Sequence, residues 1–280
     1  MNETLKRAIS GAVYIILLLF CIHNNVVSYF VLFGFFLIVA VYEFCNLIKI
    51  SKLVPIALAF LCYTSYTYIV FIKLIVLRSY EIVFLISTIY VSIRAILFLF
   101  NDSKTELTIF NKTDFLLGYI IFPFIILAKI PFGENNDYNP KIITGIFVII
   151  WTNDTFAYIV GKSIGRTKLL ERISPKKTIE GFIGGVAFAI LAGLLISKYY
   201  IQPVESFKNK SALIWMTSAL LIGVFGTIGD LIESKFKRIA GVKDSGTIMP
   251  GHGGILDRLD SVIFVAPFIY LFYQILYYVS

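Results

Sequence analysis

The stretch "SVIFVAPFIYLFYQILYY", residues 261–278, is predominantly apolar over 18 residues and carries no charge. As an α-helix that rises about 1.5 Å per residue, it is long enough to cross most of the roughly 30 Å hydrocarbon core of a bilayer. It follows directly on "VKDSGTIMPGHGGILDRLDS", residues 242–261, which holds three Asp, four Gly, a Lys, an Arg and a His. Together the two stretches predict a transmembrane helix that begins at an unusually polar segment.

Apolar runs of this kind recur along all 280 residues, of which 58% are hydrophobic and 15% charged. This composition and the mean hydropathy of +0.85 exclude an ordinary soluble domain, in which about a quarter of the residues are charged. We predict an all-α, polytopic integral membrane protein with about nine transmembrane helices. The predicted spans lie near 8–22, 25–44, 53–72, 82–100, 115–130, 142–162, 182–201, 211–232 and 261–278.

The distribution of basic residues indicates the orientation of the chain. If the N-terminus is cytoplasmic, 17 of the 25 Lys and Arg fall in the N-terminal tail and the even-numbered loops, where short cytoplasmic loops retain them. Because these loops lengthen toward the C-terminus, we divide the chain into an N-terminal transmembrane region, 1–114, and a C-terminal transmembrane catalytic region, 115–280. The net charge of +8 favours anionic lipids or polyphosphates as partners over nucleic acid.

Polar side chains inside two predicted spans need a reason, because a charge near the bilayer centre costs at least about 2.5–3.5 kcal/mol. Asn153 and Asp154 lie in the middle of the sixth span. They either hydrogen-bond a neighbouring helix or line a water-filled functional cavity, and we favour the cavity. Arg94 in the fourth span either has a similar role or extends to the membrane surface, and we assign it to no site.

The basic loop "GKSIGRTKLLERISPKKTIEGFIGG" precedes the seventh span. Ser174 and Pro175 are expected to form a turn that places Lys176 and Lys177 at the start of a helix. Cations beside the free N–H groups of a helix start favour phosphate binding. The alternative is that the loop only sets the membrane topology.

A third polar segment leaves the eighth span. Helical spacing places one set of polar residues on a single face: Asp230, Glu233, Ser234, Lys237 and Arg238. The following "GTIMPGHGG" has the composition of a backbone that turns sharply near a ligand. Helix is expected to resume near Ile255, with Asp257 and Asp260 on one face.

The carboxylates of this segment are hard oxygen ligands, and the cysteines and two histidines of the chain show no zinc spacing, so Mg²⁺ is the predicted metal. Interleaved cations suit a polyphosphate chelated by the metal: Lys237, Arg238, Lys243 and Arg258. The pattern predicts phosphoryl or nucleotidyl transfer. The alternative, acids and bases that only pair with one another, does not need a glycine-rich turn.

The stretch "SKFKRIAGVKDSGTIMPGHGGILDRLDS" resembles the signature of the phosphatidate cytidylyltransferase family, also called CDP-diacylglycerol synthases. The signature residues are Ser234, Lys237, Arg238, Lys243, Asp244, Gly246, Pro250, His252, Gly253, Gly254, Asp257, Arg258 and Asp260. Met249 departs from it, where the family usually has Leu, Ile or Phe, and a change between apolar residues of similar size alters little there. "NDTFAYIVGKSIGRTKL" and "SPKKTIEGFIGG" are also similar to the family.

The resemblance implies that CTP and phosphatidic acid give CDP-diacylglycerol and pyrophosphate, with one or two Mg²⁺ ions as cofactor. The implied roles are catalytic for Lys237, Arg238, Asp244 and Asp257, substrate-binding for Asp154, Ser174, Lys176, Lys177, Ser234, Lys243, His252 and Arg258, and metal-binding for Asp230, Asp257 and Asp260. His252 either contacts the nucleotide or phosphate or holds the loop. The family includes dimers, so a homodimer is expected.

A lipid phosphate stays at the membrane surface while CTP is cytosolic, so the expected site is a cytoplasmic pocket sunk into a bacterial cytoplasmic membrane and open sideways to lipid. A CTP-dependent polyprenol or phytol kinase would use similar groups to attack the γ-phosphorus of CTP. A membrane carrier is the other alternative, because intramembrane Asp and interrupted helices also mark ion paths.

Overall fold

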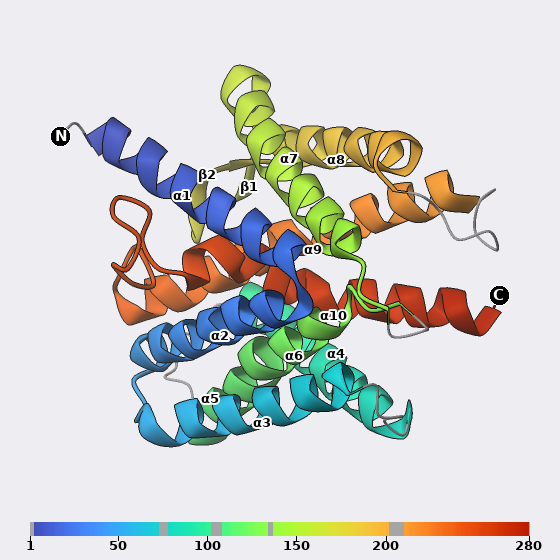
Figure 1. Cartoon of the computed structure of the whole chain (residues 1–280). Coiled ribbons are helices and arrows are strands. Elements are labelled where there is room, and N and C mark those ends of the chain that lie inside the picture. Colours follow the sequence, from blue (N-terminus) through green and yellow to red (C-terminus); the bar gives the residue numbers. More distant parts are fainter. Residues whose placement is uncertain (1–2, 73–77, 102–107, 134–136, 202–209, 280) are drawn as a thin grey trace.

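The computed structural model describes residues 3–72, 78–101, 108–133, 137–201 and 210–279. Its elements are α1 (Glu3–Asn24), α2 (Val26–Ile48), α3 (Leu53–Phe71), α4 (Arg78–Phe100), α5 (Ile109–Phe115), η1 (Leu116–Ile121), α6 (Phe122–Lys129), α7 (Pro140–Ile164), β1 (Lys168–Leu170), β2 (Ser174–Thr178), α8 (Ile179–Tyr199), α9 (Ser211–Ala240) and α10 (Leu256–Val279), as shown in Figure 1. Within the described ranges, nine helices are long and apolar enough to cross a membrane, with α5, η1 and α6 joined into one span. The predicted all-helical, polytopic membrane fold is therefore confirmed.

Local sequence signals set several helix ends. Asn25 begins α2 with a capping box, in which its side chain accepts the Ser28 N–H at 2.8 Å and the Ser28 hydroxyl accepts the Asn25 N–H at 3.2 Å. Gly241 ends α9 in the left-handed region at φ 74°, which glycine adopts without strain. Helix α9 thus continues to Ala240, beyond the predicted span end near 232, as expected for a polar helical face that leaves the span. Helix α10 starts at Leu256, so the prediction that helix resumes near Ile255 is confirmed.

The fifth span is a helix with a π-helical segment, η1, in its middle. Pro123 is the second residue of α6, which follows η1 without a break. Because proline lacks an N–H and its ring crowds the carbonyl four residues earlier, the helix widens just before it. Tyr119 of η1 is buried, and its hydroxyl donates to the Gly229 carbonyl of α9 at 3.4 Å. The irregular turn therefore packs against the helix that carries the predicted polar face.

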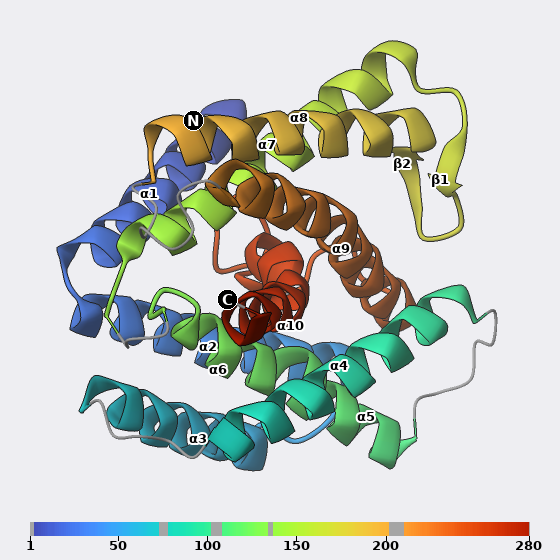
Figure 2. The same cartoon turned by 90° about the vertical axis from the view of Figure 1, so that its right-hand side faces the viewer.

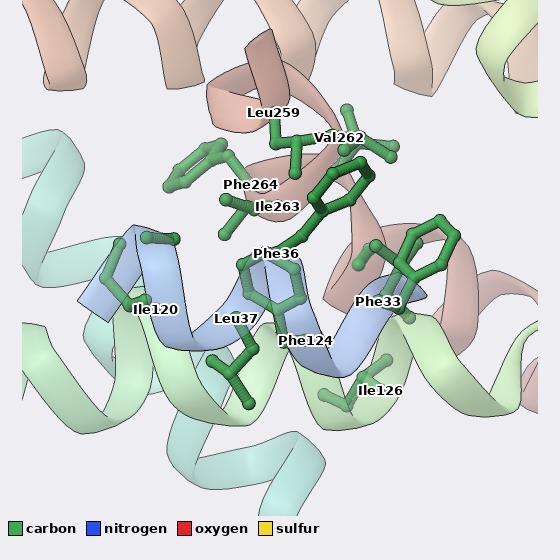
Figure 3. Close-up of a cluster of buried hydrophobic side chains, with 14 of the residues drawn as sticks. Phe33, Phe36, Leu37, Ile120, Phe124, Ile126, Leu259, Val262, Ile263 and Phe264 are labelled. Atoms are coloured by element: carbon green, nitrogen blue, oxygen red, sulfur yellow. The ribbon is translucent and has the colours of Figure 1, made fainter. Parts of the chain in front are cut away.

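Helix α10 is the centre of the bundle, and Figure 2 shows it end-on with the other helices around it. Figure 3 shows side chains of α2, α6 and α10 packed together, such as Phe36, Phe124 and Ile263. Each of these three is at most 1% exposed. A central position explains why α10 is apolar on all sides over most of its length after Asp260.

Helices α7, α8 and α9 pack closely through glycines of α8. A Cβ added at Gly185 would lie 2.8 Å from the Asn153 carbonyl oxygen, and one at Gly193 would lie 2.6 Å from the Trp215 carbonyl oxygen. Small residues at such positions let helix backbones approach within a membrane. This contact holds Asn153 and Asp154 of α7 beside α8 and α9.

Candidate active site

The candidate active site lies where the β1–β2 hairpin, the C-terminal end of α9 and the glycine-rich loop, residues 241–255, meet. Figure 1 shows the loop and the hairpin on the side of the molecule where the N-terminus lies, away from the C-terminus. Gly251 and Gly253 have φ angles of 78° and 87°, which are strained for other residues. The Met249 N–H donates to the Gly253 carbonyl at 2.9 Å. The sharp turn predicted for this segment is therefore present.

Asp257 fixes the glycine-rich loop to the first turn of α10. Its Oδ2 atom accepts the backbone N–H groups of Ser245 at 2.9 Å and Gly254 at 2.7 Å, and the Ser245 hydroxyl lies 2.9 Å from the same atom. Its Oδ1 atom lies 2.6 Å from Nζ of Lys237. This single carboxylate therefore joins the loop, α10 and α9.

Lys237 is buried between two carboxylates. Besides Asp257, its ammonium contacts the Glu233 carboxylate one helical turn earlier. Glu233 is 1% exposed, and its Oε1 atom has no hydrogen-bond partner in the described part of the chain. Asp260 is also buried and interacts electrostatically with Glu233 and Lys237. Three carboxylates near one ammonium leave an excess of negative charge, which a cationic ligand would neutralise.

A second ion pair joins the hairpin to α9. Nζ of Lys177 lies 2.6 Å from Oδ2 of Asp230, and the Ser234 hydroxyl donates to Oδ1 of Asp230 at 3.2 Å. Asp154 of α7 is exposed and interacts electrostatically with Asp230 and Lys177. The Asn153 side-chain amide donates to Asp154 at 3.2 Å. The structure therefore brings predicted site residues of α7, β2 and α9 together.

The remaining predicted site residues lie around these two ion pairs. The exposed ones are Lys176, Arg238, Lys243, Asp244 and Arg258, and Ser174 is half-buried in β2. The Arg238 guanidinium donates to the Ile173 carbonyl at 3.4 Å and to the Val242 carbonyl at 3.2 Å, so it ties the hairpin to the glycine-rich loop. Asp244 lies beside Gly253.

The predicted helix start at Lys176 and Lys177 is wrong. Both lysines lie in β2, which pairs antiparallel with β1, and α8 begins at Ile179. The helix is capped by Thr178, whose hydroxyl accepts the Gly181 N–H at 3.1 Å, and not by Ser174. The error arose because Ser-Pro is a common start of a helix, while the backbone pairing of a short hairpin leaves little pattern in the sequence.

His252 contacts the first helix. The Ser10 hydroxyl lies 2.7 Å from Nδ1 of His252 and 3.0 Å from the Pro250 carbonyl. Burial lowers the pKa of His252 below its usual value, and the charges of Arg258 and Arg7 lower it further. Of the two roles considered for His252, the contact with α1 supports holding the loop, while contact with a nucleotide stays a prediction.

Glu43 of α2 is a residue that the sequence analysis missed. It is 1% exposed, and its Oε1 atom accepts the Ile255 N–H at 3.1 Å and its Oε2 atom the Leu256 N–H at 2.8 Å. The Ser245 hydroxyl lies 3.1 Å from Oε2. The available signal was a lone carboxylate within an apolar span, because such a group needs a buried partner.

The donor types of the site fit a hard divalent cation such as Mg²⁺. Asp230, Asp257 and Asp260 are all present, and Glu233 adds a buried carboxylate whose Oε1 lacks a hydrogen-bond partner within the described residues. In the same ranges, no three acidic, histidine or cysteine side chains are spaced to hold an ion. Lysine ammonium groups already pair with Asp230 and Asp257, so an ion would require at least one of these pairs to open.

The sequence profile of the cytidylyltransferase family matches residues 5–276, which is almost the whole chain. The phosphatidate cytidylyltransferase of Bacillus subtilis (strain 168) is 44% identical over 157 residues, which are 52% of this chain and 56% of the relative. That of Staphylococcus epidermidis (strain ATCC 12228 / FDA PCI 1200) is 42% identical over 165 residues, 57% of this chain and 61% of the relative. That of Staphylococcus aureus (strain COL) is 41% identical over 165 residues, again 57% of this chain and 61% of the relative. The chain thus covers less than two thirds of each relative.

Proposed function

Because the chain belongs to the cytidylyltransferase family, we propose that it transfers a cytidylyl group from CTP to phosphatidic acid, forming CDP-diacylglycerol and pyrophosphate. The observation that carries this proposal is the pair of ion pairs at one end of the bundle, Lys177 with Asp230 and Lys237 with Asp257. They put acids and bases side by side, as the binding of a polyphosphate and its metal requires. The names of the relatives above support the same reaction.

The chemistry needs charge compensation more than proton transfer. An oxygen of the lipid phosphate attacks the α-phosphorus of CTP, and the bond from that phosphorus to the oxygen bridging to the β-phosphate breaks, so its electron pair leaves with pyrophosphate. The nucleophile is already anionic, so no strong general base is required. Two polyanions must instead be held together. The exposed Lys176, Lys243 and Arg258 would bind phosphate oxygens, and Lys177 would do so once released from Asp230.

Asp230, Asp257 and Asp260 are the proposed ligands of one or two Mg²⁺ ions, and Glu233 is a further candidate. When bound, Mg²⁺ would neutralise phosphate oxygens of the nucleotide and of the leaving pyrophosphate. Lys237 and Ser245 would then hold Asp257, and Ser234 would hold Asp230, in the orientation that the ligand needs.

The proposed enzyme lies in the membrane with its active site on the cytoplasmic side. The chain has the helices of an integral membrane protein, and the basic hairpin and glycine-rich loop favour a cytoplasmic site and N-terminus, in the cytoplasmic membrane of a bacterium. Phosphatidic acid would reach the exposed Asp154 side of the site from the bilayer while CTP enters from the cytosol. A homodimer and a catalytic region over residues 115–280 belong to the same proposal.

The test is to follow two radioactive labels with the purified, detergent-solubilised protein, phosphatidic acid and Mg²⁺. We expect label from [α-³²P]CTP in a lipid product and label from [γ-³²P]CTP in pyrophosphate, with both lost when EDTA is added. A γ-label in lipid when polyprenols or phytol are offered would replace the proposal with a kinase. Absence of both products with every lipid would leave the carrier as the alternative to pursue.

A further inference from the structure

Glu43 is a buried carboxylate of the second span that is held against the glycine-rich loop. Its two oxygens accept the N–H groups of Ile255 and Leu256, and its Oε2 atom lies 3.1 Å from the Ser245 hydroxyl. The two N–H groups lie at the start of α10, where a helix leaves its first N–H groups without partners within the helix. Glu43 therefore caps the central helix from a distant part of the chain.

Two glycines of the loop make room for this carboxylate. A Cβ added at Gly246 or at Gly254 would overlap the carboxylate oxygens of Glu43. Both positions belong to the signature stretch, and neither has a positive φ that would itself demand glycine. The loop is therefore shaped around Glu43, and not only around a ligand.

Ser245 connects Glu43 to the active-site carboxylate. Its hydroxyl lies 3.1 Å from Oε2 of Glu43 and 2.9 Å from Oδ2 of Asp257. Its single hydrogen can be donated to one of them at a time. The Ser245 and Gly254 N–H groups both donate to Asp257, so the same short segments are held by Glu43 on one side and by Asp257 on the other.

We propose that Glu43 is a positioning residue for Asp257. By fixing Ser245 and the start of α10, it presents the Asp257 carboxylate to Lys237 and to the substrates, so the N-terminal region contributes to the active site. The inference rests on the proposed cytidylyl transfer for its activity readout. Removing a residue that orients a metal-ligating side chain typically lowers metal affinity or activity roughly 10–100-fold.

The test variant is Glu43→Gln, which keeps the shape but replaces one acceptor oxygen by a donor. Its matched control is Glu81→Gln in α4, a half-buried glutamate that accepts hydrogen bonds from Tyr66 and Tyr270 outside the site. We expect kcat/KM for CTP to fall roughly 10–100-fold in Glu43→Gln and to stay near the wild-type value in Glu81→Gln. If Glu43→Gln does not fold, Glu43→Asp, which keeps the charge on a shorter side chain, takes its place.

Two further measurements separate positioning from simple stabilisation. In an Asp257→Asn background, Glu43→Gln should cost less than about twofold in kcat/KM, because residues that act through one another are not additive. Hydrogen exchange of the peptide covering residues 243–256 should be faster in Glu43→Gln. Equal losses in the Glu43 and Glu81 variants, a full Glu43 effect in the Asp257→Asn background, or unchanged exchange would each overturn the proposal. If the wild type makes no CDP-diacylglycerol, the proposed function fails, and exchange alone decides whether Glu43 holds the loop.

Discussion

Replacing Asp257 by asparagine keeps the size of the side chain but removes its charge and one of its acceptor oxygens. The remaining oxygen can still accept the N–H groups of Ser245 and Gly254. The new NH₂ group then faces the Lys237 ammonium, whose hydrogen bond to Asp257 is 2.6 Å long in the native protein. The variant therefore loses one charge-assisted hydrogen bond, while Lys237 keeps its contact with Glu233.

The loss of a hydrogen bond between charged groups is worth about 1.5–3 kcal/mol. Since about 1.4 kcal/mol corresponds to a tenfold change in rate, kcat/KM for CTP should fall at least about 10- to 150-fold. We would measure it from the release of pyrophosphate, beside the melting temperature of each protein. Glu171→Gln, which removes the same charge from an exposed residue of the hairpin, is the control. An Asp257→Asn protein within threefold of the wild-type kcat/KM would refute the reasoning.

Two further predictions concern stability. In Gly229→Ala, the new Cβ would lie 2.6 Å from Cβ of Phe264, so overpacking that costs about 1–3 kcal/mol should lower the melting temperature. In the control, Gly226→Ala, the nearest atom to the new Cβ is 3.6 Å away. Equal melting temperatures for the two variants would contradict this packing. The pKa of His252 is lowered in the folded protein, so the unfolded chain binds the proton more tightly. The neutral imidazole therefore contributes to the free energy of unfolding fully above the unfolded pKa of about 6.5, and this contribution is lost as the pH falls below that value. The melting temperature should therefore fall more steeply between pH 8 and 5.5 in the wild type than in His252→Gln, and parallel curves would count against this.

The membrane spans and the polar face of α9 could be predicted because each depends on local spacing. A bilayer requires apolar runs of a certain length, and the 3.6-residue period places Asp230, Ser234 and Lys237 on one side of a helix. The signature around Asp257 could also be identified, since it is continuous in the sequence. The sequence therefore indicated which segments meet at the candidate site and most of the charged groups that lie there.

Contacts between distant segments could not be predicted in the same way. The hairpin depends on backbone pairing between Lys168 and Thr178, which has no hydrophobic period to reveal it. Glu43 contacts residues more than 200 positions later, and its role becomes visible only when α2 packs beside α10. A lone glutamate in an apolar span indicates that a partner exists, but not which segment supplies it.

The contact between Glu43 and α10 has a consequence for biogenesis. Ile255 and Leu256 follow Glu43 by 212 and 213 residues, so α2 is synthesised long before its partners exist. The ribosome adds about 5–20 residues per second, so this interval lasts on the order of 10–40 s. During that time the carboxylate enters the membrane without the N–H groups that later receive it. The arrival of α10 therefore both fills the middle of the bundle and supplies the backbone N–H groups that the Glu43 carboxylate accepts.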